Sequence, residues 1–186
     1  MSLTLLSPPA AEPVTLSELK AHLRVTTDDE DALITGMLVA AVRAVEARAS
    51  LALMPQQWRL TLDAVPEETL FLPLSPVSAL DDVTVIGGEG EAQTVADNLY
   101  DFVPGASARL RRAGPWPNPV PRLGGVRIDF TAGYADADAV PEPLKQAVKN
   151  LAAFFFESRE AAGEAKIYAV PSSVDALIAP YREALL

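Results

Sequence analysis

The chain has no cysteine and a single histidine, His22, among its 186 residues. The lack of cysteine excludes disulfide bonds and thiolate metal sites, and one histidine cannot build a multi-histidine zinc site. Positive charge is also scarce, because 15 Lys and Arg stand against 25 Asp and Glu, for a net charge of −10. This balance argues against nonspecific binding of nucleic acid by the whole surface. No charge-free apolar run approaches the ~18 residues of a membrane helix, so we expect no membrane contact.

The N-terminal third has the signals of two helices behind an extended, proline-containing arm over residues 1–14. Thr15 and Glu18 form a capping box, in which each side chain satisfies a free amide of the first helical turn. The helix that follows is expected to end near Val25 and to leave His22 partly exposed. A second capping box at residues 27–30 predicts a long helix over about residues 28–50, with apolar residues at helical spacing.

The periodicity then changes to the alternation of β-strands. Trp58, Leu60 and Leu62 alternate with polar residues, which is typical of a half-buried strand. Further strands are predicted at residues 83–86, 100–103, 109–111 and 126–131, with glycine turns between some of them. We therefore expect residues 57–131 to form a compact β-rich insertion between helical segments.

A third helix is expected to begin at Pro143, since proline is tolerated in the first helical turn. Its apolar residues, flanked by Phe154 and Phe156, span an arc of roughly 200°, whereas a surface helix needs little more than 100°. Either this helix lies inside its own core, or one flank is buried against another subunit. A tail with a short helix after Ser172 completes an α+β fold of one domain. Its helical bundle is predicted over residues 14–56 and 140–186.

Several segments, taken in order, resemble the head–tail connector (adaptor) proteins of long-tailed bacteriophages, prophages and gene transfer agents, in particular those with a larger β insertion. The matching segments are VTLSELKAHLRV (residues 14–25), FLPLSPV (71–77), FTAGY (130–134), VPEPLKQA (140–147), FESRE (156–160) and LIAPYR (177–182). No single segment is specific, but their order and spacing together cover most of the chain.

The resemblance implies a noncatalytic subunit of a ring, usually of about twelve copies, beneath the portal in the neck of a virion or phage-like particle. It implies three protein partners: the portal, a tail-side stopper or head-completion protein, and further copies of the chain. Double-stranded DNA would pass through the ring without specific binding. The protein would be made in the bacterial host cytoplasm and need no cofactor.

The predicted subunit or portal interface lies on the third helix and the tail. Its residues are Phe154, Phe156, Ile167, Tyr168, Leu177, Ile178, Tyr181 and Arg182. Burial of each apolar side chain in such a contact returns ~1.5–3 kcal/mol, and linked copies in a ring raise the effective concentration of the tails. The alternative is a tail that folds back on its own bundle.

A basic stretch stands out in this acidic chain, because residues 105–127 contain five arginines and no acidic residue. The possible partner or DNA contacts are Arg109, Arg111, Arg112, Trp116 and Arg122, with Arg127 close behind. These residues suit an acidic protein face or DNA phosphates. The other interpretation is a solvated strand edge whose charges prevent aggregation.

Two alternatives to a structural role were considered. A DNA-binding module would use the arginines of residues 109–127, and a metal-dependent hydrolase would use Asp136 and Asp138, whose oxygens suit a hard cation. The segment that holds Asp136 and Asp138 lacks the regular spacing of acidic residues found in a calcium-binding loop. The glycines at residues 87–90 are not followed by the Lys-Ser/Thr pair of a phosphate-binding loop. We therefore expect a solvated loop and a hairpin turn at these two places.

Overall fold

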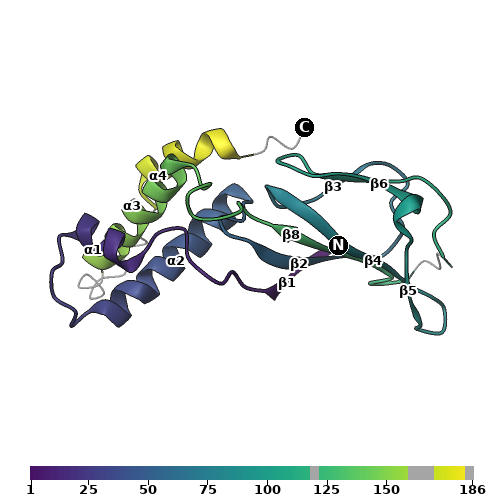
Figure 1. Cartoon of the computed structure of the whole chain (residues 1–186), viewed down its shortest axis with the longest axis horizontal. Helices are drawn as coiled ribbons and strands as arrows, with labels where there is room; N and C mark the ends of the chain where they lie inside the picture. Colours follow the sequence, from purple (N-terminus) through teal and green to yellow (C-terminus); the bar gives the residue numbers. More distant parts are fainter. Residues whose placement is uncertain (118–121, 159–169, 183–186) are drawn as a thin grey trace. The chain divides into compact units, whose positions relative to one another are not determined.

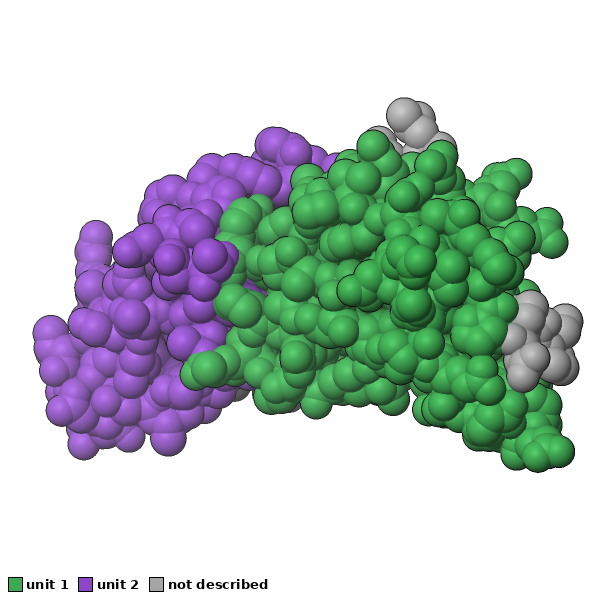
Figure 2. All heavy atoms as spheres, turned by 45° about the vertical axis from the view of Figure 1, so that its right-hand side comes forward, with its two compact units in different colours: residues 1–10, 55–134 green, residues 11–54, 135–186 purple. Residues whose placement is uncertain are grey.

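The computed structural model describes residues 1–117, 122–158 and 170–182 (Figure 1). The chain forms two compact units, shown in different colours in Figure 2. The β unit comprises Met1–Ala10 and Pro55–Tyr134, and the helical unit comprises Ala11–Met54 and Ala135–Leu186. The predicted α+β class is confirmed, with the β-rich part inserted between the second and third helices and a short helix near the C-terminus.

The helical unit begins with α1 (Leu16–Leu23) and its predicted capping box. The backbone amide of Glu18 donates to the Thr15 hydroxyl at 3.2 Å, and the Thr15 amide donates to the Glu18 carboxylate at 2.7 Å. The second predicted box is wrong, because α2 (Asp31–Ala49) is preceded by Glu30, which makes no side-chain cap bond. The acidic residues before α2 instead form a loop.

The core of the helical unit lies where α1, α2, α3 (Glu142–Ser158) and α4 (Ser172–Ile178) meet. A 3₁₀ turn, η3 (Ala179–Tyr181), follows α4 directly. The side chains with no exposed surface include Leu19, Ile34, Val45, Leu144, Leu151, Val174 and Ile178. All four helices therefore contribute to one apolar core.

The larger sheet of the β unit has the strand order β1-β2-β8-β4-β5. Its strands are β1 (Ser2–Ser7), β2 (Gln56–Leu62), β8 (Val126–Ala132), β4 (Val77–Ile86) and β5 (Ala92–Thr94). The extended arm predicted at the N-terminus contains β1, which pairs antiparallel with β2 and places Leu5 opposite Trp58. The glycines after β4 form the predicted turn of the β4–β5 hairpin.

A smaller antiparallel sheet has the order β3-β7-β6, from β3 (Leu70–Phe71), β7 (Arg109–Arg112) and β6 (Tyr100–Val103). The 3₁₀ turn η1 (Asp97–Leu99) precedes β6. Gly105 supplies the positive φ of 114° in the β6–β7 connection, a conformation that side chains with a Cβ rarely adopt. This sheet carries three of the arginines singled out in the sequence, Arg109, Arg111 and Arg112.

Candidate interaction surfaces

Acidic residues of the loop before α3 and of strand β4 make local backbone and side-chain contacts. Asp136 accepts a hydrogen bond from the backbone amide of Ala139 at 2.8 Å, which closes the loop before α3. Asp81 accepts from the Thr131 hydroxyl at 2.9 Å, and Asp82 accepts from the Thr84 hydroxyl. Within the described residues, no group of three or more His, Cys, Asp or Glu side chains is placed to hold a metal ion. None of the described helices is long and apolar enough to cross a membrane.

Arg109 and Arg111 lie together on the exposed face of β7, while Leu110 between them is buried. The strand register places Arg109 between Phe71 of β3 and Val103 of β6. Both apolar neighbours are exposed, Phe71 to 52% and Val103 to 44%. Arg111 forms an ion pair with Asp101 at 2.7 Å. This face therefore combines positive charge with apolar surface, and a shallow pocket of about 230 Å³ in it is lined by Thr69, Asp101, Val103, Arg109 and Arg111.

The other residues of the basic stretch have separate roles. Arg122 donates to the carbonyl of Gly87 at 3.0 Å and so supports the β4–β5 turn. Trp116 is 4% exposed and its Nε1 donates to the Leu99 carbonyl at 3.0 Å, which places this side chain inside its own unit. Arg112 is exposed at the end of β7 and faces Tyr100 in the register. Burial, followed by a hydrogen bond to Asp97, raises the pKa of Tyr100 to about 12.

Helix α4 packs on its own helical unit, as the alternative interpretation of the tail has it. Ile178 has no exposed surface, while Leu177 and Tyr181 are half-buried. Asp175 accepts hydrogen bonds from Arg48 of α2, both at 3.2 Å, and from Arg182 at 3.1 Å. The predicted contacts Ile167 and Tyr168 lie outside the described residues.

The phenylalanines at the end of α3 are half-buried. The Phe154 and Phe155 rings lie 6.2 Å apart with a tilt of 51°. The buried stripe of α3 runs through Leu144, Ala147, Val148, Leu151 and Ala152, so this helix is largely committed to its own core. A contact of Phe154 and Phe156 with another subunit stays a prediction.

The outer face of α2 is a surface that the sequence-based interpretation missed. Leu33 and Val39 are 45% and 37% exposed, although the opposite side of the helix is fully buried. The available signal was the absence of any charged residue between Asp31 and Arg43. An apolar segment without a polar face predicts a helix that is covered on all sides.

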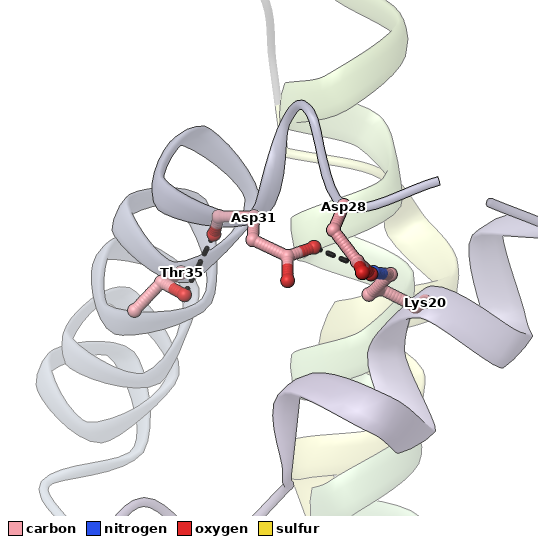
Figure 3. Close-up of polar contacts among 4 residues, drawn as sticks. All are labelled: Lys20, Asp28, Asp31 and Thr35. Carbon is pink, nitrogen blue, oxygen red and sulfur yellow. Dashed lines mark hydrogen bonds and ion pairs between the residues drawn. The ribbon is translucent and has the colours of Figure 1, made fainter. Parts of the chain in front are cut away.

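A groove beside α1 is the second surface that sequence reasoning did not find. It is lined by Leu16, Ser17, Lys20, Ala21, Val25, Asp28 and Asp31, with a volume of about 590 Å³. The Lys20 ammonium contacts the carboxylates of Asp28 at 2.5 Å and Asp31 at 2.6 Å, and so joins α1 to the loop before α2 (Figure 3). The hydrogen bonds to Asp28 and Asp31 raise the pKa of Lys20, and the same contact lowers that of Asp28.

The comparisons with known proteins agree on one family. The model of the phage gp6-like head-tail connector protein family matches residues 13–89. A chain in the virion of a native gene transfer agent particle is 32% identical, with a TM-score of 0.82, and the match covers 100% of this chain and 97% of that chain. No curated protein matches the chain significantly.

Two further solved structures show the same likeness. Chains in the neck of an empty gene transfer agent particle, computed with C6 symmetry, and in the neck of a native particle, computed with C12 symmetry, are each 31% identical to this chain. Their TM-scores are 0.82 and 0.74, and both matches cover 100% of this chain and 97% of the other. The chain therefore belongs to the phage gp6-like head-tail connector family. It is a structural head–tail connector and not an enzyme, as the resemblance in the sequence predicted.

Proposed function

We propose that this chain is one subunit of a ring that joins head to tail in the neck of a phage-like particle. The single observation that carries the proposal is the likeness over the whole chain, at 32% identity, to a chain of a gene transfer agent virion. The necks that contain two similar chains were computed with C12 and C6 symmetry. A twelve-fold ring of this chain is the arrangement that we infer from them.

The partners follow from the position of such a ring. One side of the ring would contact the portal, and the other would contact a tail-side stopper or head-completion protein. Double-stranded DNA would pass through the opening. The net charge of −10 supports this role, because a negatively charged channel repels DNA phosphates and lets the duplex slide without binding.

The C-terminal segment is the part that we propose to contact the portal. Since α4 is anchored by Ile178 and Asp175, its accessible contribution is smaller than the sequence suggested. Arg182, which is exposed although it pairs with Asp175 at 3.1 Å, and the half-buried ring of Tyr181 are the residues that we propose for this contact. One tail would bind weakly, but the copies of a ring would bind together with a raised effective concentration.

Electron microscopy of the purified protein mixed with a candidate portal tests the proposed function. The expected result is stacked annular complexes in which the added ring lies against the portal. A mixture in which the two proteins stay separate, with the connector monomeric beside intact portal rings, would contradict the proposal. The portal alone and the connector alone are the controls.

A further inference from the structure

The outer face of α2 exposes apolar side chains to solvent. We define this outer α2 face by its exposed residues Ala32, Leu33, Gly36, Val39 and Ala40. The neighbouring Thr35 is also exposed, and its hydroxyl donates to the Asp31 carbonyl at 2.8 Å (Figure 3). Its polar group is thus satisfied within the helix, and no charged side chain interrupts the face.

The solvent side of α3 shows what an ordinary exposed face looks like in this unit. There Glu142 contacts Lys145 and Lys149, each at 3.6 Å, and the exposed positions are Glu142, Pro143 and Glu157. In α2 the apolar residues of the inward side, such as Ile34 and Leu38, already supply the core. The exposed Leu33 and Val39 therefore add nothing to that core, and a helix that is apolar all round is normally a covered helix.

A second copy of this chain is the occupant that the proposed ring supplies. Rings of more than two subunits use heterologous contacts, in which a patch on one copy meets a different patch on the next. The receiving surface must therefore lie elsewhere on the same chain. The α1 groove shares no lining residue with the outer α2 face, so the two surfaces can meet in a heterologous contact.

We propose that the outer α2 face of one copy packs into the α1 groove of the neighbouring copy. Leu33 and Val39 are the apolar anchors, and they meet the apolar lining that Leu16, Ala21 and Val25 provide. Gly36 has no side chain and that of Ala40 is one methyl group, so the two helices can approach closely. Lys20 is already paired with both of its carboxylates, so the groove offers no unpaired ammonium group to the arriving apolar face.

The absence of cysteine makes this contact accessible to thiol crosslinking. The doubly substituted protein Leu33→Cys, Ala21→Cys is assembled on the candidate portal and treated with a short bismaleimide. The expected result is a ladder of covalent multimers, since each copy presents one thiol to each neighbour. Either single variant alone is expected to give no ladder, because a heterologous contact never brings two identical positions together.

The control for geometry is the pair Leu123→Cys, Ala21→Cys, since Leu123 is 88% exposed but belongs to the β unit. Three results would overturn the proposed contact. The first is a ladder no stronger than that of the control pair, and the second is the absence of a ladder in visibly assembled rings. The third is crosslinked dimers from the Leu33→Cys variant alone. The inference rests on the proposed ring. Electron microscopy of the same samples distinguishes a wrong contact from a wrong ring. Rings without a specific ladder refute only the contact, whereas the absence of rings refutes both.

Charge substitution gives a second test that does not depend on crosslinking. The variant Leu33→Lys, Val39→Lys is expected to stay folded, with an unchanged melting curve, and to lose at least ten-fold in ring yield on the portal. Leu123→Lys is the matched control and is expected to assemble normally. Normal ring yield from the folded double variant would overturn the proposal.

Discussion

At the scale of single residues, Glu12 is a partly buried carboxyl group of the helical unit. Its Oε2 is buried, and among the described residues no hydrogen bond reaches this atom. Burial raises the pKa of Glu12, the nearby Arg43 opposes this effect, and Glu46 adds to it. Glu46 accepts hydrogen bonds from the Arg43 guanidinium at 2.6 Å and from the Leu53 amide at 2.8 Å. The positive charge of Arg43 therefore acts on the carboxylates of both Glu12 and Glu46.

Glu12→Gln is therefore expected to raise the free energy of unfolding at neutral pH. The folded state binds the proton of Glu12 more tightly than the unfolded state, so the stability of the natural protein falls as pH rises from the ordinary value of 4.5 through the raised folded-state pKa. The advantage of the variant should be present above that window and vanish below pH 4.5. Urea unfolding across this pH range checks it, with the exposed Glu68→Gln as control. An advantage that does not change with pH would contradict this account.

At the scale of elements, local signals predicted α1 and the short helix α4, but not the contacts that hold the two ends of the chain. The capping box at Thr15 is a property of four neighbouring residues, and the structure confirms it. The extended backbone near the N-terminus was predicted but its pairing was not, because β1 is held by hydrogen bonds to the sequence-distant β2 rather than by its own periodicity. The packing of α4 likewise depends on Arg48 of α2, which no local pattern indicates.

The tail either contacts the portal or folds back on its own helical bundle, and the two interpretations differ in which of these contacts Ile178 stabilises. Because this side chain is fully buried in its own unit, Ile178→Ala is expected to lower the free energy of unfolding by about 2–5 kcal/mol. Leu177→Ala, at the half-buried neighbouring position, should cost clearly less. Chemical unfolding followed by circular dichroism measures both. If Ile178→Ala kept full stability and lost only portal binding, the tail would be an interface element instead.

At the scale of the whole molecule, the charge distribution decides between a DNA channel and a DNA-binding module. We expect no retention of double-stranded DNA even at about 50 mM salt, because the strongly acidic chain outweighs its small arginine face. Arg111 is moreover already paired with Asp101. A gel-shift titration checks this. Binding that weakens steeply with salt and disappears in Arg109→Glu, Arg111→Glu would favour the DNA-binding alternative.

The family and the function were predictable from the sequence, whereas the surfaces were predictable only in part. The order of short segments such as FTAGY and VPEPLKQA identified the family over most of the chain. Trp116 suggested an interface anchor, yet it fills its own unit, because a sequence gives a side chain's chemistry and not its neighbours. Leu33 and Val39 were missed since an apolar helix without a polar face looks like a core helix until its exposure is known.

The pairing of β1 with β2 has a practical consequence for anyone who shortens this protein. The family match starts at residue 13, so a truncated protein designed from that match would begin there. Such a truncation would remove the edge strand β1 from the five-stranded sheet. The backbone amides and carbonyls of β2 would then be free to pair with strands of other molecules. Aggregation of a truncated protein would then result from the missing strand and would not show that the connector itself is defective.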